Sequence, residues 1–454
     1  MPGSTWSSAG PLGPRSTALS WHQRAVDLTV QPAASEIGCT TATGWGHEMN
    51  EIVADAAWCW FGDPRAVYHN GRLYYGWVDS KGHIWIAQVD TATWTRRRFL
   101  IAPDTHVDDH DNPSIVIRGG RVCVFWCGHA GRSMRYRVAT NPDSIDGFGP
   151  VVTCAAGNTP GRFGFTYPNV AQMAHDNALY LLWRGGNFQP TFSRSTSVTA
   201  NVWSPARHLF SVPGEDRPYL KMITDGTAWL HFMMTDGHPH NVATSLYYVG
   251  WWVVDDSFRR ADGTRLASLA DAPIPVSSLE KVYDGVANPR AWIWDLQLDA
   301  GLNPHAVFAV LNSREDHEYW SARHNGDWQV NRICDAGGTI AQDGERFYSG
   351  GAALDPLDLD TVAVSRPPGP QDLHRIETWR TGDGGVTWRH AATISDTQQQ
   401  NVRPFYVRGA PAGMNWRLMW LRGTYGQFRD FALRLLGGEP TGAQRSATSV
   451  ALTS

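Results

Sequence analysis

The sequence lacks the features that mark several large classes of protein. Its 454 residues contain no apolar run of about 18 residues, so no membrane-spanning helix is expected. Charged residues make up only 18%, the net charge is −4 and no basic run occurs, which disfavours nucleic acid as a partner. No CxxC pair occurs among the six cysteines, so neither a zinc ribbon nor a thioredoxin-type site is predicted.

The two ends of the chain lack hydrophobic periodicity. Residues 1–40 are rich in Ser, Ala and Pro, and residues 438–454 are small and polar. We therefore expect flexible segments at 1–40 and 438–454 and one folded domain at 41–437. The first 20 residues show no apolar segment of the kind that a secretory signal needs, so a cytoplasmic location stays open.

What the sequence has in abundance is Trp (22), Gly (45) and Pro (27). Aromatic residues favour half-buried strands, while Gly and Pro favour turns, and together they predict an all-β protein of many short strands. Cys123 and Cys127 are interpreted as buried thiols on one face of a strand, and one or two disulfides elsewhere stay open.

The interior repeats with a period of roughly 35–50 residues, which is typical of propeller blades. Most units begin with a polar or aromatic residue, often before Pro, and continue into an aromatic second strand. The units begin at Asp63-Pro64, Asn112-Pro113, Tyr167-Pro168, Arg217-Pro218, Ala291-Trp292, Tyr348-Ser349 and Arg403-Pro404. Seven units predict a single-domain, seven-bladed β-propeller; two β-sandwiches are the alternative.

Two further segments support a blade architecture. Residues 381–388 match the Asp-box pattern S/T-x-D-x-G-x-T-W, in which Asp383 binds turn amides and Trp388 is buried between strands. The role of this box is structural. The segment from Asp255 to Val282 lengthens the fourth unit and is predicted to be a loop at the rim.

The most polar stretch of the chain is residues 106–112, which hold two His, three Asp and an Asn before an apolar strand. Such a group is costly to bury without partners, so it is either a structural polar cluster or a site that handles protons or metal. His110 and Tyr167 occupy equivalent places in adjacent units, and so do His129 and Arg184. We expect these four side chains to meet at one mouth of the channel.

This set resembles a known active site. Asp109-His110-Asp111-Asn112-Pro113-Ser114, followed by His129, Tyr167-Pro168 and Arg184, is similar to the pattern of the seven-bladed propeller polysaccharide lyases with BNR-type repeats. That group includes ulvan lyases and L-rhamnosyl-α-1,4-D-glucuronate lyases. Tyr348-Ser349-Gly350-Gly351 resembles their sixth blade, whereas Asp111 stands where the family usually has Asn.

The resemblance implies a β-elimination that cleaves the L-rhamnose-α-1,4-D-glucuronate linkage and releases terminal rhamnose. Tyr167 and His110 would be the base and acid, in an order that stays open, while Arg184 and His129 would neutralise the uronate carboxylate. Substrate contacts are expected from Asp109, Asn112, Arg217, Tyr219, His238 and Tyr348. The partner would be an acidic glycan such as ulvan or gum arabic, which suggests an extracellular location. We expect a monomer.

Two other functions stay open at this point. A glycoside hydrolase would need two carboxylates on opposite sides of the bond, whereas Asp108, Asp109 and Asp111 all lie on one segment. A non-catalytic glycan-binding propeller is the other alternative. The chemistry requires no cofactor; a structural calcium or zinc ion is a further expectation, with candidate ligands His238, His240, His305, His317 and Cys334.

Overall fold

The computed structural model describes residues 51–438 except 215, 343 and 371, and within them it shows strands and short 3-10 helices but no α-helix. None of the helices in this part of the chain is long and apolar enough to cross a membrane. The expected flexible segment 1–40, and the tail beyond residue 438, lie outside the described residues.

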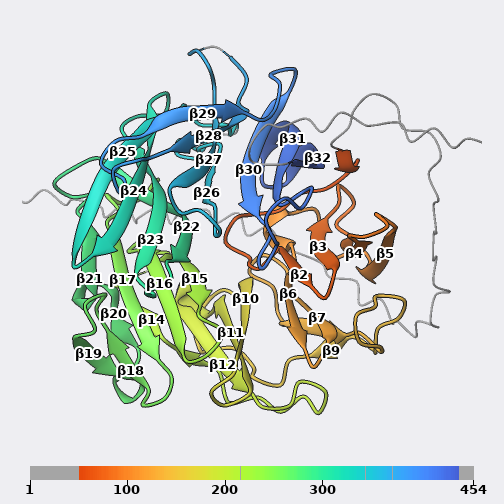
Figure 1. Ribbon diagram of the computed structural model, residues 1–454. Helices are drawn as coiled ribbons and strands as arrows, with labels where there is room; N and C mark the ends of the chain where they lie inside the picture. The colour runs from red at the N-terminus through yellow and green to blue at the C-terminus, as the bar shows by residue number, and fades with distance from the viewer. Residues whose placement is uncertain (1–50, 215, 343, 371, 439–454) are drawn as a thin grey trace, which may run out of the picture. The chain divides into compact units, whose positions relative to one another are not determined.

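Six of the seven blades follow one another along the chain as antiparallel sheets (Figure 1). Blade one comprises β2 (Ala66–His69), β3 (Arg72–Val78), β4 (Ile84–Asp90) and β5 (Arg96–Ala102). Blade two comprises β6 (Ser114–Arg118), β7 (Arg121–Trp126), β8 (Arg135–Val138) and β9 (Val152–Thr153). Blade three comprises β10 (Thr166–Met173), β11 (Ala178–Arg184), β12 (Pro190–Ser195) and β13 (Arg207–His208). Blade four begins with β15 (Tyr219–Thr224), β16 (Trp229–Thr235) and β17 (Leu246–Trp252). Blade five comprises β22 (Arg290–Leu298), β23 (Pro304–Leu311), β24 (His317–Asn325) and β25 (Asp327–Gly337). Blade six comprises β26 (Ala352–Leu354), β27 (Thr361–Arg366), β28 (Arg375–Arg380) and β29 (Arg389–Thr393).

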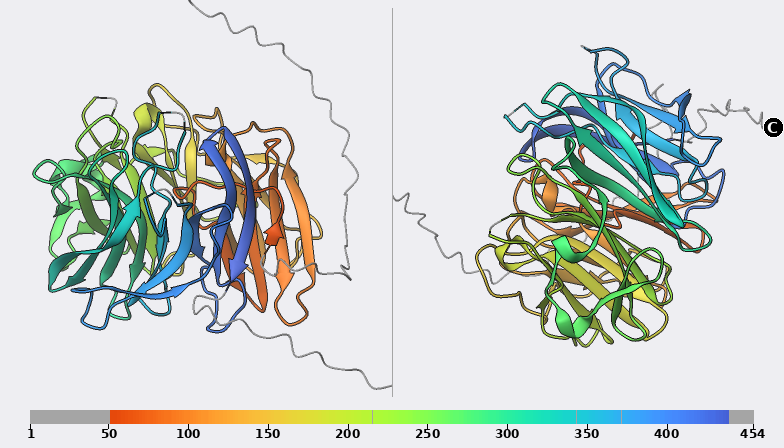
Figure 2. Two further views of the ribbon diagram at one scale, coloured as in Figure 1. Left: turned by 90° about the horizontal axis from the view of Figure 1, so that it is seen from above. Right: turned by 90° about the vertical axis from the view of Figure 1, so that its left-hand side faces the viewer.

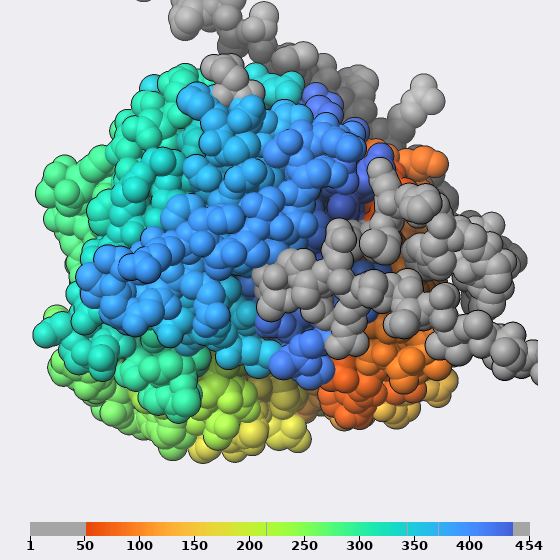
Figure 3. Space-filling view, turned by 45° about the horizontal axis from the view of Figure 1, so that its top comes forward, coloured from red at the N-terminus to blue at the C-terminus, as the bar shows by residue number. Residues whose placement is uncertain are grey.

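Blade seven joins the two ends of the described chain. It contains β30 (Gln400–Tyr406), β31 (Leu418–Gln427) and β32 (Asp430–Gly438), and β1 (Glu51–Val53) pairs antiparallel with β32 as its outermost strand. The blue strands of this blade lie between blade six and the orange strands of blade one (Figure 2, left), and dark blue and orange surfaces meet in Figure 3. The predicted seven-bladed propeller is confirmed, and the two-sandwich alternative is wrong.

Blade four corrects one expectation. The segment 255–282 is not a loop, because it forms β18 (Ser257–Arg259), β19 (Arg265–Ser268), η3 (Leu269–Asp271), β20 (Ile274–Pro275), η4 (Val276–Ser278) and β21 (Glu280–Tyr283). β18 and β21 both pair with β17, and β20 pairs parallel with β14 (Phe210–Ser211). Phe258, Ile274 and Val276 are buried in the core of blades three and four, and this burial stabilises the extra strands.

The centre of the ring is filled by residues 58–63, which we call the central segment. Side chains from four blades bind its backbone: Asn112 accepts from Cys59 N (3.0 Å), Asn169 donates to Phe61 O (2.8 Å), and Lys221 and Arg403 donate to Trp60 O and Trp58 O (both 2.5 Å). Trp60 stacks on Trp294 with ring centroids 4.1 Å apart. Because buried backbone groups need partners, these polar residues hold the segment across the channel.

The Asp-box adopts the expected conformation in the β28–β29 turn. Asp383 accepts hydrogen bonds from Thr381 Oγ1 (2.8 Å) and Thr387 N (2.9 Å), Gly385 has φ 96°, and Trp388 is buried. The structural role predicted for this box is confirmed. The five cysteines in the described part, including Cys123 and Cys127, are free and buried, so no disulfide forms among them.

Candidate active site

The polar stretch forms a short helix, η1 (Asp109–Asp111), at the entrance to blade two. Asp108 caps it by accepting a hydrogen bond from His110 N (3.0 Å), and the side chains of η1 are buried. The cap turns the His110 ring toward the residues that begin blade three. A capped polar turn before an apolar strand therefore fixes the position of His110.

The four residues expected to converge do so. The rings of His110 and His129 stack with centroids 4.2 Å apart and planes at 10°, and the Tyr167 ring is 5.3 Å from that of His110. Arg184 Nη2 lies 3.3 Å from His129 Nε2, and its guanidinium carbon lies 4.7 Å from the Tyr167 ring centroid. The convergence is a finding; the role of each residue stays a prediction.

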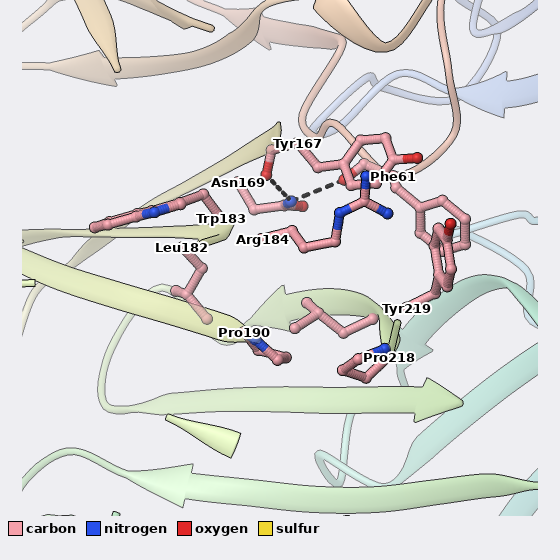
Figure 4. A pocket seen from close by; sticks show the side chains of 10 residues that line it. Phe61, Tyr167, Asn169, Leu182, Trp183, Arg184, Pro190, Pro218 and Tyr219 are labelled. Atoms are coloured by element: carbon pink, nitrogen blue, oxygen red, sulfur yellow. Dashed lines mark hydrogen bonds between the residues drawn. The ribbon is translucent and has the colours of Figure 1, made fainter. Parts of the chain in front are cut away.

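Tyr167 is held by a bulge in β10. Its φ is 58°, in the left-handed region that tyrosine rarely adopts, and the pairing of β10 with β11 shifts register between Thr166 and Asn169. Asn169 donates to Tyr167 O (3.1 Å) and to Phe61 O, which ties the bulge to the central segment (Figure 4). Such strained conformations persist where the surroundings impose them, which is common at functional sites.

Asp108 holds both histidines through their Nδ1 atoms. Its Oδ1 lies 2.6 Å from His110 Nδ1 and its Oδ2 lies 3.0 Å from His129 Nδ1. These neighbours, chiefly His110, keep the Asp108 pKa well below its usual range despite burial. Each Nδ1 can donate to this carboxylate, which leaves each Nε2 for other partners.

The two histidines differ in charge. His110 Nδ1 also lies 2.9 Å from Asp109, and the two carboxylates outweigh burial and raise the His110 pKa well above 6.5. Burial, with His110 and Arg184 nearby, lowers the pKa of His129 to about 4. At neutral pH His110 is therefore a cation, and His129 is neutral with a lone pair on Nε2.

Asp109 and Asn112 do not fit the expected contact with substrate, because both have 0% exposure. Asp109 accepts from Arg403 Nη1 (2.7 Å) and Tyr425 OH (3.0 Å), and Asn112 binds Cys59 N and Gly62 O. Their polar groups are thus engaged below the surface. They position His110 and the central segment instead.

Asp111 contacts His129 and His106. It accepts from His129 N (2.7 Å) and pairs with His106, and burial raises its pKa to about 6. The carboxylate that stands where the family usually has Asn is therefore paired with His106. His106 was not among the predicted site residues, although it lies in the same polar stretch.

Arg184 is a buried cation without an acidic partner among the described residues. Its side chain is surrounded by the rings of Tyr167, Tyr219 and Phe188, and its Nε and Nη1 atoms make no hydrogen bond. A cavity of about 20 Å³ borders it (Figure 4). A buried guanidinium without an acidic partner is costly, so this position is suited to an anionic ligand.

The remaining predicted contacts lie around this cation at different depths. Tyr219 is 5.4 Å from His238 and 5.3 Å from Trp292 between ring centroids, and Arg217 lies 5.6 Å from the Phe188 ring. Burial, aided by Arg217, lowers the His238 pKa well below 6.5. Tyr348 is deeper, against Trp60 and Trp292, so it supports the floor of the site.

The structure does not gather the candidate metal ligands. His238 and His240 approach Glu345 (3.9 and 3.4 Å), His305 approaches Asp299 (3.7 Å), and His317 Nδ1 contacts Ser349 Oγ (2.9 Å). Cys334 is a buried thiol. The described residues contain two groups that could hold a metal, Cys59/Asp109/His110 and Asp108/His110/His129, and neither includes these candidates. A structural metal ion stays a prediction.

Blade seven supplies site residues that the sequence did not reveal. Phe428 lies in the β31–β32 turn, and its ring centroid is 5.1 Å from that of His110 and 5.5 Å from that of His129, with the planes nearly perpendicular. Its carbonyl accepts from Asp109 N (2.8 Å). Arg429 Nε lies 3.2 Å from Asp108. No local motif marks this turn; ring closure alone brings it to blade two.

Comparisons with known proteins agree with this architecture. The model of the BNR repeat-containing family matches residues 72–336. An ulvan lyase of family PL25, solved bound to -[GlcA(1-4)Rha3S]-, is 14% identical, with 86% of this chain and 94% of that chain covered and a TM-score of 0.64. The polysaccharide lyase Uly1 is 12% identical, with coverage of 88% and 94% and a TM-score of 0.52. No curated protein matches the sequence.

Fold and repeats together define a seven-bladed propeller of the kind found in ulvan lyases. Because the family model matches more than half of the chain, the chain belongs to the BNR repeat-containing family. The resemblance that the sequence suggested is thereby confirmed for fold and repeat type.

Proposed function

We propose that the protein is a polysaccharide lyase that cleaves a 4-linked glucuronate next to L-rhamnose by β-elimination, releasing terminal rhamnose and leaving an unsaturated uronate. The observation that carries the proposal is the buried Arg184 cation without an acidic partner, beside a neutral His129 and a protonated Tyr167. The fold shared with ulvan lyases supports the choice of an acidic glycan.

The uronate carboxylate supplies the anion that Arg184 lacks. A planar guanidinium binds a carboxylate through two hydrogen bonds, and cationic His110 adds positive charge nearby. Neutralising the carboxylate makes the adjacent C5 proton more acidic, because charge develops on this group as the proton leaves.

Two assignments of the base and the acid can be distinguished by experiment. The resemblance assigns these two roles to Tyr167 and His110. The charges of the free site favour His129 as the base, because His110 already carries its proton. When the substrate carboxylate binds Arg184 Nη2, this atom no longer contacts His129 Nε2. The free Nε2 lone pair then accepts the C5 proton. The electron pair of the C5–H bond forms the C4–C5 double bond as the C4–O bond breaks. Tyr167, whose pKa burial raises well above 10, donates its proton to the leaving oxygen.

The hydrolase alternative is disfavoured by burial. Hydrolysis needs two carboxylates that reach the bond or its water, but Asp108, Asp109 and Asp111 each have 0% exposure. A glycan-binding propeller without activity would bind through Arg184 and show no turnover.

The test is incubation of the protein with ulvan, gum arabic and glucuronan, following ultraviolet absorbance of the unsaturated uronate and released rhamnose. Product without an unsaturated uronate contradicts a lyase. The pH profile of kcat/KM separates the bases: with His129 as base, activity falls only as pH drops toward about 4. With His110 as base, activity instead keeps rising as pH increases beyond 6.5.

A further inference from the structure

Two loops of blade three present a stacked aromatic pair beside the site. Phe163 precedes β10, Phe188 lies in η2 (Gly186–Phe188) after β11, and their ring centroids are 3.8 Å apart with planes at 19°. Phe163 is 38% exposed and is the only aromatic among the large exposed hydrophobic residues of the described chain. A stacked pair left open to solvent is not explained by packing of the core.

The pair is fixed before any ligand binds. Asn187 N donates to Arg162 O (2.7 Å), and Arg162 N donates to Asn187 Oδ1 (2.8 Å), so the two loops are tied together. Phe163, Asn187 and Phe188 have φ of 70°, 52° and 61°. These three non-glycine residues thus adopt the left-handed region, which costs free energy and persists only where the surrounding structure imposes it.

The pair is continuous with the proposed carboxylate site. The guanidinium carbon of Arg184 lies 5.1 Å from the Phe188 ring, and that of Arg217 lies 5.6 Å from the same ring. A uronate bound to Arg184 would therefore have its neighbouring sugar near Phe188. An apolar sugar face suits an aromatic surface better than a charged or fully hydroxylated one does.

We propose that Phe163 and Phe188 form a stacking subsite for the 6-deoxyhexose next to the uronate. Its methyl group and C–H face pack on the rings, while the uronate occupies Arg184. This assignment rests on the proposed function and adds the residues that select the neighbouring sugar. The subsite binds and orients substrate and takes no part in proton transfer.

The test compares Phe188→Leu and Phe163→Leu in the full chain with two ligands. Turnover is followed on ulvan oligosaccharides, which contain rhamnose, and binding is followed by calorimetry on glucuronan oligosaccharides, which contain only glucuronate. Leucine keeps an apolar side chain but removes the ring face. We expect KM for the ulvan substrate to rise about tenfold, with kcat changed by less than about twofold, and Kd for glucuronan to stay unchanged. Unchanged KM on ulvan in both variants overturns the subsite.

The matched control is Leu302→Ala in the β22–β23 turn. Leu302 is 37% exposed with φ 64°, close to the values of Phe163, but it lies at the far end of its inner strand from the site. The KM of the Leu302→Ala variant for the ulvan substrate should equal that of the wild type. Should the wild type cleave no uronate glycan, the proposed function fails, and calorimetry with ulvan oligosaccharides decides the subsite separately: weaker binding by Phe188→Leu supports it, and equal or absent binding overturns it.

Discussion

Blades three and seven begin with the same backbone feature and use it differently. Tyr167-Pro168 begins the bulge of β10 and Arg403-Pro404 that of β30, with φ of 58° and 56° at the first residue. Both strands shift register at this point, and both side chains are buried in the channel. The repeat therefore supplies one geometry twice, and the neighbouring residues decide what it does.

The difference lies in the partners of the buried cations. In blade seven, Arg403 pairs with Asp109 (2.7 Å) and donates to Trp58 O (2.5 Å), so its charge is balanced within the fold. In blade three, Arg184 beside Tyr167 has no acidic partner in the described chain. We infer that the first stabilises the fold and the second is kept for a ligand, and the following experiments test this contrast.

The largest expected effect is on turnover in Tyr167→Phe. The substitution keeps the ring but removes the phenolic oxygen, so turnover of a uronate glycan should fall by about 10²–10⁴-fold with little change in melting temperature. Tyr406→Phe in blade seven is the control, because Tyr406 OH is also buried but has no partner and lies outside the site. A near-normal rate in Tyr167→Phe would rule out its proton-transfer role.

Next in size is the loss of stability in Arg403→Met. Removing this cation leaves His110 as the remaining cationic partner of buried Asp109 and takes the donor from Trp58 O. The free energy of unfolding should therefore fall by about 3–5 kcal/mol in urea titrations. Adding Asp109→Asn should recover part of the loss, because both buried charges are then gone. A loss below about 1 kcal/mol in the single variant would show that the pair is not needed for stability.

The sequence repeat predicts where each blade begins and which site residues meet. The X-Pro positions and aromatic second strands locate the blades, and equivalent positions in adjacent blades bring His110, His129, Tyr167 and Arg184 together. Sequence could not show that Asp109 points inward to Arg403, because the two are 294 residues apart and meet only through ring closure. For the same reason it missed Phe428, and it misread segment 255–282, whose buried residues lie too far apart to give a strand pattern.

Acid should destabilise the fold before it affects ion pairs such as Asp109–Arg403. Burial lowers the pKa to about 4 in each of five histidines: His129, His231, His305, His317 and His374. The unfolded chain binds their protons below about 6.5 and the folded chain only near 4, so stability falls as pH decreases across this window. Three groups oppose this trend because their pKa values are raised in the folded chain: Asp111, to about 6, and His106 and His110, which lie beside carboxylates. They are outnumbered by the five histidines.

Urea titrations between pH 7 and 5 measure this effect: the urea concentration at the unfolding midpoint should decrease as the pH is lowered. His374→Asn should weaken the dependence by about one proton, because its ring is buried against Gln400 and makes no contact with His110 or His129. A midpoint that stays constant or rises toward pH 5 would contradict the burial of neutral histidines.

The smallest effect on stability, and the most discriminating, is expected for Arg184→Met. Methionine fills similar space without a charge, so removing an unpaired buried cation should leave the free energy of unfolding unchanged or raise it by about 1–2 kcal/mol, while turnover is lost. Arg417→Met is the matched control: Arg417 makes two hydrogen bonds to Asp355 (2.5 and 2.6 Å), and its loss should destabilise by about 3–5 kcal/mol. If Arg184→Met is as destabilising as Arg417→Met, Arg184 is part of the scaffold, and the contrast between blades three and seven disappears.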